Sequence, residues 1–143
     1  MPGESRRSGR LPAEMGSSIP TLKGGAVHEM SLVQGVLDAV VPAAREAGAE
    51  AVTKITLRIG EMTMVVRESM EFAFEVLSED VPLLERCELV LEFVPCRSTC
   101  LACGETFEHD RLHMRCPNCD SAATQLICGR ELEVASMEIE TPD

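Results

Sequence analysis

The sequence predicts an α+β fold, in which a small domain of two helices and a three-stranded sheet is interrupted by a compact module containing cysteines. Two segments repeat their apolar residues at spacings of three and four, which is the pattern of an amphipathic helix. Three segments alternate apolar and polar residues, as half-buried strands do. Two Cys-x-x-Cys pairs lie between the second and the third of these strands, so we expect the module to be inserted there.

The first 26 residues differ from the rest of the chain. They are rich in Gly, Ser, Pro and Arg, show no apolar periodicity and carry a net charge of +2, whereas the remaining residues carry −13. They also lack the apolar run of a signal peptide. Such a composition buries too little apolar surface to order itself, so we expect a disordered leader over residues 1–26.

Two helices follow from the apolar periodicity. The first begins near Met30 and stops near Gly48, because glycine is a common helix stop. Pro42 lies within it and lacks an N–H, so we expect a kink or a division of the helix there. The second helix is expected over about residues 66–77. The apolar positions are Met30, Val33, Leu37, Val40, Val41 and Ala44 in the first helix, and Val66, Met70, Phe74 and Leu77 in the second.

Three strands are expected over residues 52–59, 87–94 and 132–139. In the third strand the apolar positions change phase between Val134 and Met137. A β-bulge would reconcile the two halves, because it adds one residue to one strand of a pair.

Composition excludes several classes of protein. The net charge of −11 argues against binding to duplex nucleic acid, which needs clustered Lys and Arg. No stretch approaches the roughly 18 apolar residues that cross a bilayer. Seven cysteines are an odd number and four of them are paired by spacing, which favours reduced thiols on a metal over disulfides. We therefore expect a cytoplasmic protein without a membrane or nucleic-acid partner.

The strongest motif consists of Cys100 and Cys103, then twelve residues, then Cys116 and Cys119. Two such pairs brought face to face form a tetrahedral cage of four thiolates, the preferred arrangement for structural zinc. Gly104 supplies the backbone freedom that such a turn needs. Four protein ligands leave no open position for a catalytic zinc. Iron fits the same ligands, but nothing else in the sequence indicates electron transfer.

The remaining cysteines and histidines near the motif have simpler interpretations. We expect Cys87 to lie in the core, because it is on the apolar face of a strand. Cys96 and Cys128 flank the module and are expected to pack rather than to bind metal. His109 and His113 lie between the two cysteine pairs, where a surface position is more common than ligation.

Several ordered segments together resemble the HypA/HybF family of hydrogenase nickel-incorporation metallochaperones. The order of these segments is specific, although each is weak by itself except the cysteine pairs. They span residues 27 to about 140. The segments are His28-Glu29-Met30-Ser31-Leu32, Ile59-Gly60-Glu61-Met62, Phe72-Ala73-Phe74-Glu75, the two cysteine pairs, and Gly129-Arg130-Glu131-Leu132.

The resemblance implies a nickel-binding α/β domain, formed by residues 27–95 and 129–143, and a zinc-ribbon-like module with four cysteine ligands over residues 96–128. It implies structural Zn(II), transient Ni(II) cargo and no enzymatic activity. It implies delivery to the hydrogenase large subunit together with a HypB-type GTPase, and for some members a role with urease maturation proteins.

In the family the nickel site lies at the extreme N-terminus, where the chain begins Met-His-Glu. A terminal amine, backbone amide nitrogens and an imidazole form fused chelate rings that suit Ni(II). Here His28 and Glu29 are present, but Val27 stands in place of the initiating Met, after 26 further residues. We expect the true start at Val27, because a GTG codon reads as Val internally and initiates with Met.

Two alternatives from other classes stay open at this point. One is a zinc-ribbon module for protein interaction without nickel binding. The other is a thiol redox protein that uses Cys-x-x-Cys for disulfide exchange. No nucleophile–base pair or phosphate-binding loop stands out in the sequence.

Overall fold

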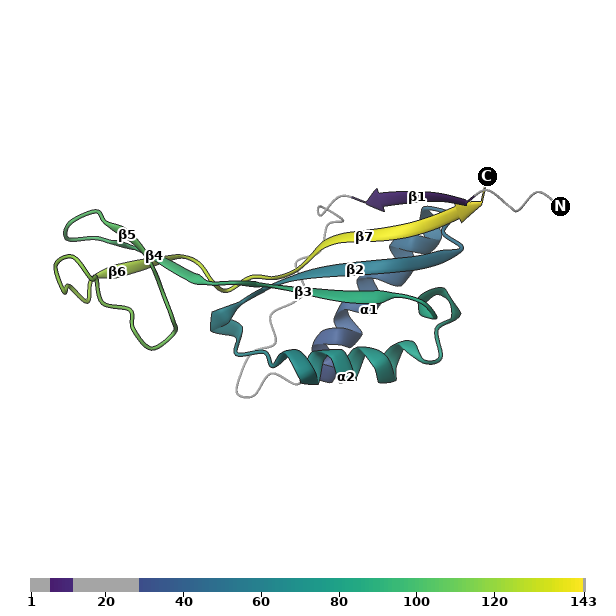
Figure 1. Cartoon of the computed structure of the whole chain (residues 1–143), viewed down its shortest axis with the longest axis horizontal. Coiled ribbons are helices and arrows are strands. Elements are labelled where there is room, and N and C mark those ends of the chain that lie inside the picture. The colour runs from purple at the N-terminus through teal and green to yellow at the C-terminus, as the bar shows by residue number, and fades with distance from the viewer. Residues whose placement is uncertain (1–5, 12–28, 143) are drawn as a thin grey trace.

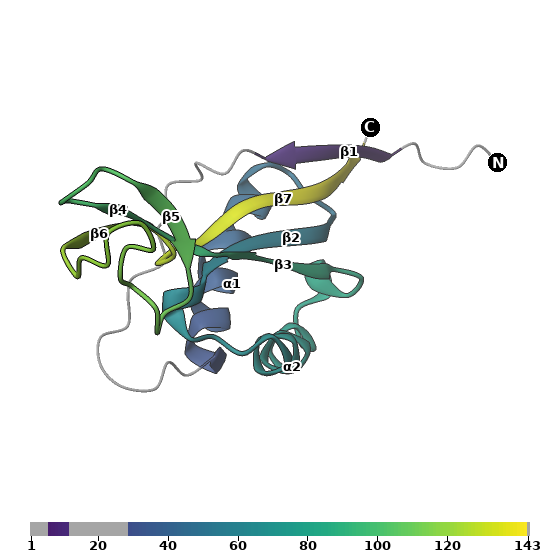
Figure 2. The same ribbon diagram turned by 60° about the vertical axis from the view of Figure 1, so that its left-hand side comes forward.

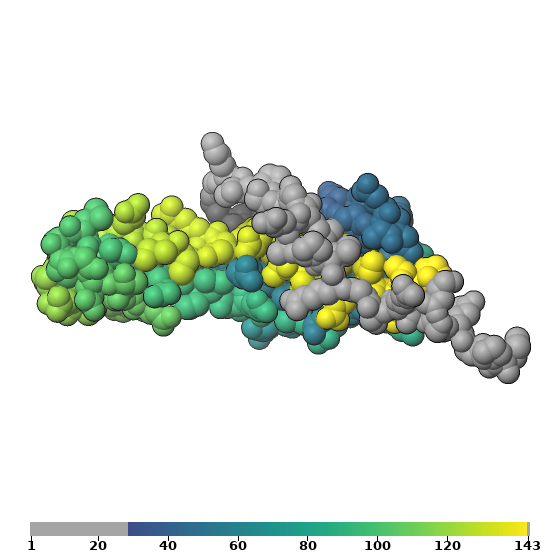
Figure 3. All heavy atoms as spheres, turned by 90° about the horizontal axis from the view of Figure 1, so that it is seen from above, coloured from purple at the N-terminus to yellow at the C-terminus, as the bar shows by residue number. Residues whose placement is uncertain are grey.

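The computed structural model describes residues 6–11 and 29–142, which form two β-sheets and two helices (Figure 1). The larger sheet has the strand order β1-β7-β2-β3, and both helices cover one of its faces (Figure 2). The smaller sheet, of order β5-β4-β6, contains the cysteine motif and extends from one end of the larger sheet. Figure 3 shows this module as a lobe beyond the α/β part, so the molecule is elongated.

Helix α1 spans Glu29–Glu46 and packs one apolar face on the sheet. It ends where predicted. Gly48 has φ +78°, its N–H donates to the carbonyl of Arg45, and the N–H of Ala49 donates to that of Ala44. This is a Schellman ending, in which glycine adopts the left-handed conformation at no steric cost. The buried residues are Leu32, Val33, Val36, Leu37, Val40 and Ala44.

Of the two outcomes predicted at Pro42, a kink or a division, the division does not occur, because α1 continues through Pro42 to Glu46. Pro42 is exposed, while Val40 and Ala44 on either side of it are fully buried. The packing of these neighbours therefore outweighs the one hydrogen bond that proline removes.

Strand β2 (Ala51–Gly60), helix α2 (Arg67–Ser78) and strand β3 (Glu88–Val94) form a crossover unit in which the two strands are parallel. Short 3₁₀ turns, Glu61–Thr63 and Pro82–Leu84, connect them. Helix α2 begins one residue later than predicted, since Val66 has extended backbone angles. Its buried face is formed by Met70, Ala73 and Phe74, and the centre of the core by Ile55, Leu57 and Ile59 of β2.

Strand β7 (Leu132–Pro142) pairs antiparallel with β2 and contains the predicted bulge. Leu57 pairs with Val134, but Thr56 pairs with Ser136, so Ala135 is an extra residue in β7. The change of phase seen in the sequence is therefore confirmed as a β-bulge, which lets both halves of the strand face the core.

Strand β1 (Arg6–Leu11) differs from the expectation of a wholly disordered leader. It pairs antiparallel with the outer edge of β7 and makes the sheet four-stranded rather than three-stranded. Without β1, the edge of β7 would offer a row of unpaired backbone N–H and C=O groups, and β1 forms hydrogen bonds with them. The six residues of β1 lack the alternation of apolar and polar residues by which a strand is predicted from sequence. The rest of the leader lies outside the described residues.

The module contains β4 (Cys96–Cys100), β5 (Thr106–His109) and β6 (Thr124–Cys128), all antiparallel. The division of the chain into a nickel-binding domain and a zinc module stays a prediction. In the part of the chain that the structure describes, no helix has the length and apolar character needed to cross a membrane.

Candidate metal centre

Two turns of matching geometry hold the four cysteines. In the first, the N–H of Gly104 donates to the carbonyl of Cys100, and Gly104 has φ +81°. In the second, the N–H of Asp120 donates to the carbonyl of Cys116, and Asp120 has φ +59°. Each Cys-x-x-Cys pair is thus followed by a residue in the left-handed conformation, which brings its two sulfurs to the same side of the turn.

The two turns face each other and bring the four sulfurs together. The Sγ atoms of Cys100 and Cys119 are 3.5 Å apart, and those of Cys103 and Cys116 are 3.6 Å apart. All four lie within 4.8 Å of one another. Four sulfurs at about 2.3 Å from a central Zn²⁺ would be about 3.8 Å apart, so the donor set fits a tetrahedral zinc ion.

Backbone and side-chain N–H groups point at the sulfurs. Cys103 N donates to Cys100 Sγ at 3.4 Å, Asn118 N donates to Cys116 Sγ at 3.4 Å, and Asn118 Nδ2 donates to Cys103 Sγ at 3.5 Å. The N–H of Cys103 lowers the pKa of the Cys100 thiol to about 6. Such donors stabilise thiolates, the form that binds metal.

The module has little apolar core. Its buried cluster consists of Cys100, Cys116 and Phe107, whereas Cys103 and Cys119 are exposed. Three residues bury too little apolar surface to offset the entropy of ordering this segment. A metal ion in the cysteine cluster is therefore expected to supply most of the folding free energy of the module.

The other cysteines and histidines lie outside this cluster, the one group of potential metal ligands found among the described residues. Cys96 is fully buried and Cys128 half-buried; neither joins the cluster. His109 shares a hydrogen bond of 2.7 Å with Ser98, and His113 contacts Asp110 at 2.8 Å. Burial raises the pKa of the half-buried Cys87 thiol to about 12.

Sequence reasoning missed two residues of the site, Asn118 and Asp120. Asn118 stands between the cysteines of the second pair and donates twice to sulfur. Asp120 occupies the position that Gly104 occupies in the first pair. The equal spacing of the two pairs was the signal for Asp120, because Asp and Asn are the usual substitutes for glycine in the left-handed region.

The predicted nickel ligands are only partly described. Val27 and His28 lie outside the described residues, and Glu29 is the first residue of α1. Its Oε1 accepts a hydrogen bond of 3.4 Å from the N–H of Val66, and Val66 is the N-cap residue of α2. A carboxylate at this position also faces the positive end of the α2 dipole. The side chain of Glu29 therefore ties the start of α1 to the start of α2.

A close backbone contact joins the module to the larger sheet. Gly60 N donates to the carbonyl of Glu131 at 2.7 Å, and Met62 N donates to the carbonyl of Gly129 at 2.8 Å. A Cβ at Gly60 would lie 2.0 Å from the carbonyl oxygen of Gly129. Only glycine permits this approach, so the end of β2 is fixed against the segment that leaves the module.

The fold and the site together define a small α+β protein in which four cysteines beside the smaller sheet are placed to hold one metal ion. The sequence matches the family described as "Hydrogenase/urease nickel incorporation, metallochaperone, hypA" over residues 27–139. The chain belongs to this HypA family of metallochaperones.

Its relatives support the assignment. The hydrogenase maturation factor HypA of Chlorobaculum parvum is 40% identical over 114 residues, which cover 80% of this chain and 100% of the relative. HypA of Aquifex aeolicus is 36% identical over 114 residues, which cover 80% of this chain and 98% of the relative. The solution structure of the Ni metallochaperone HypA from Helicobacter pylori has the same fold, with a TM-score of 0.57 and 22% identity, covering 79% of this chain and 97% of that one.

Proposed function

We propose that this chain binds Ni(II) at its N-terminal segment and delivers it for the maturation of [NiFe]-hydrogenase. The observation that carries the proposal is the family match over residues 27–139, which includes both the His28-Glu29 segment and the four cysteines. The relatives that cover most of this chain are named as hydrogenase maturation factors.

In this proposal the four-cysteine site holds structural Zn(II). The sulfur separations of 3.5 and 3.6 Å fit tetrahedral Zn–S coordination, and four ligands leave no place for a substrate. Nickel cargo needs a different site, because an ion that is handed on must exchange with an acceptor.

Nickel binding is assigned to Val27, His28 and Glu29. A chain whose first residue is 27 offers a terminal amine, backbone nitrogens and the imidazole of His28, a set that suits square-planar Ni(II). Both the amine and the imidazole must lose a proton, so nickel affinity falls as the pH drops below about 8. The carboxylate of Glu29 contacts the N–H of Val66, so we assign Glu29 to the nickel site through its backbone nitrogen and its negative charge rather than through its carboxylate oxygens.

The partners in this proposal are a HypB-type GTPase and the hydrogenase large subunit. Urease maturation proteins are a further set, since the family description names urease as well as hydrogenase.

Complementation of a strain that lacks the gene tests the function. We expect the unmodified gene to restore hydrogenase activity and the His28→Ala variant not to restore it. Excess nickel in the medium should restore part of the activity in the deletion strain. His113→Ala is the matched control, because His113 is an exposed histidine that lies outside the cysteine cluster. Full activity with His28→Ala would contradict the assigned nickel site and favour a zinc-ribbon interaction module that does not bind nickel.

A further inference from the structure

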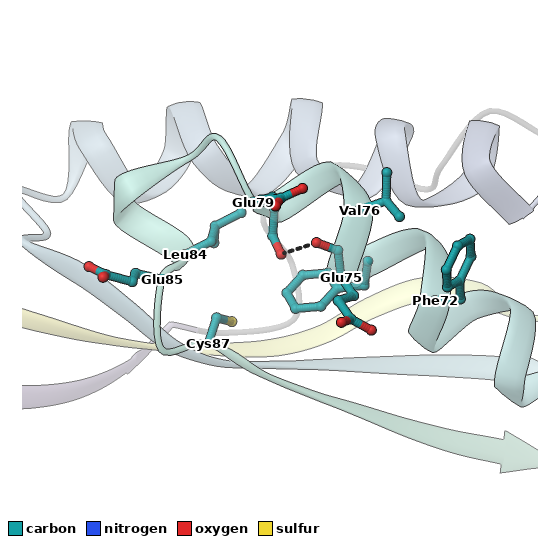
Figure 4. A pocket seen from close by; sticks show the side chains of 9 residues that line it. Phe72, Glu75, Val76, Glu79, Leu84, Glu85 and Cys87 are labelled. Carbon is teal, nitrogen blue, oxygen red and sulfur yellow. Dashed lines mark hydrogen bonds between the residues drawn. The ribbon is translucent and has the colours of Figure 1, made fainter.

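A groove of about 560 Å³ opens between α2, the turn that follows it and the start of β3 (Figure 4). Buried side chains of Phe74 and Leu84 form its apolar base. Phe72 and Val76 line it from α2 and are 64% and 39% exposed. Large apolar side chains left in water beside a groove are typical of a surface that another molecule covers.

The same groove is strongly acidic. Glu75, Glu79 and Glu85 line it, and no basic side chain of the described residues forms an ion pair with them. Glu75 and Glu79 are four residues apart on one side of the helix, and like charges at this spacing destabilise a helix. A cation placed between them would remove this repulsion.

The place of these carboxylates at the C-terminal end of α2 destabilises the helix further in the absence of a ligand. Helix α2 ends at Ser78, is followed by Glu79 and Asp80, and has no basic residue in its last turn. The last turn of a helix carries a partial negative charge and is stabilised by cations, not by carboxylates. The acidic residues thus oppose the stability of α2, and a positively charged ligand bound beside them would relieve this cost.

We propose that this groove binds a basic amphipathic segment of a partner protein. An apolar side chain of the segment packs against Phe72, Val76 and Leu84, while Lys or Arg residues pair with Glu75, Glu79 and Glu85. Anionic lipid surfaces and nucleic acids are repelled by the same carboxylates.

The inference rests on the proposed function for the identity of the partner. Helix α2 has 12 residues, so its two ends are about 18 Å apart. The acidic residues of the groove lie toward the C-terminal end, and the contact of Glu29 with Val66 lies at the N-terminal end; Phe72, between them, also lines a smaller pocket with Glu29 and Met30. A partner bound in the groove therefore pairs its basic residues away from the start of α1 but lies beside the nickel segment at Phe72. This suits the GTPase, which assists the transfer, better than the large subunit, which must reach the ion.

Calorimetric titration of the purified HypB-type GTPase into the zinc-loaded full chain tests the proposal. Charge reversal by Glu75→Lys with Glu79→Lys should weaken GTPase binding by about tenfold or more, and so should Phe72→Ala, since groups in the centre of an interface dominate its affinity. Matched controls are Glu92→Lys with Glu108→Lys, two exposed acidic residues on other elements, and Leu112→Ala, an exposed leucine of the module. The controls should change the affinity by less than about twofold.

Two results would overturn the proposal. The first is unchanged GTPase affinity in both groove variants while circular dichroism shows that they are folded. The second is a loss of binding to the hydrogenase large-subunit precursor with GTPase binding intact. Failure of the proposed function is a separate result, because it would appear as an absence of nickel binding by the unmodified chain. Nickel affinity should be the same in the charge-reversal variant of Glu75 and Glu79 and in the unmodified chain.

Discussion

Gly60 lies where the end of β2 meets the segment that leads from the module into β7. The space for a side chain there is filled by the backbone of Gly129 and Arg130, which lies within 2.0–2.5 Å of the position of a Cβ. Backbone cannot move aside as the end of a flexible side chain can. A single methyl group at position 60 would therefore push the end of β2 away from the segment that leaves the module.

We expect Gly60→Ala to lower the free energy of unfolding by at least about 3 kcal/mol, because the added methyl forces a backbone shift. Urea denaturation measures the loss. Gly48→Ala is the control: nothing lies within 4 Å of its Cβ position, so only the left-handed backbone is strained, at a cost of about 1 kcal/mol. Equal losses in the two variants would show that the close contact is absent.

Cys87 lies in the groove beside α2, and burial raises the pKa of its thiol to about 12. We expect it to react with iodoacetamide far more slowly in the folded chain than in urea at pH 9, since the thiolate is the reactive form. Because the pKa is raised in the folded state, this group has no effect on stability below about pH 8 and lowers stability as the pH rises from about 9 to 12. Mass spectrometry of alkylated peptides measures the rate; fast alkylation in the folded state would contradict the buried position.

The spacing of the cysteines was sufficient to predict which four side chains meet, because two Cys-x-x-Cys turns have few ways to face each other. Asn118 and Asp120 could not be predicted with the same ease. Their roles depend on one N–H direction and one φ angle, and many residues are compatible with either position in a sequence.

Among the elements, α1 shows the clearest disagreement between local preference and tertiary packing. Pro42 removes one backbone hydrogen bond, yet the helix continues because Val40 and Ala44 are buried on its inner face. The cost of the proline is therefore still present in the folded protein.

We expect Pro42→Ala to raise the free energy of unfolding by about 1–3 kcal/mol, because alanine restores the N–H donor and the helical preference at an exposed position. Thermal unfolding followed by circular dichroism measures the change. A loss of stability would indicate that the ring of Pro42 makes a packing contact that its exposure does not suggest.

The other strands could be predicted where apolar and polar residues alternate along the chain. The strands over β2, β3 and β7 and the bulge at Ala135 followed from apolar periodicity, since each strand has one face on the core. Strand β1 could not be found in this way. Its pairing depends on the backbone of the β7 edge and not on its own pattern of side chains.

At the scale of the whole molecule, the two parts differ in what holds them together. Among the described residues, the α/β part has a core of 18 buried residues, whereas the buried cluster at the cysteines has three. Metal removal should therefore affect the two parts unequally.

We expect a strong zinc chelator to abolish the hydrogen-exchange protection of β4, β5 and β6 while β2, β3 and β7 keep theirs. Hydrogen-exchange mass spectrometry at the level of peptides resolves the two regions. Loss of protection in both parts together would show that the cysteine site holds the entire fold and not the module alone.

We propose that one chain holds a permanent zinc and a transferable nickel at separate sites. Native mass spectrometry tests it most directly, on protein expressed from the natural gene with its own start region, before and after addition of one equivalent of nickel. We predict one zinc in every molecule and uptake of one nickel that the His28→Ala variant does not retain. One zinc with no nickel uptake, or equal uptake by the variant, would contradict the claim.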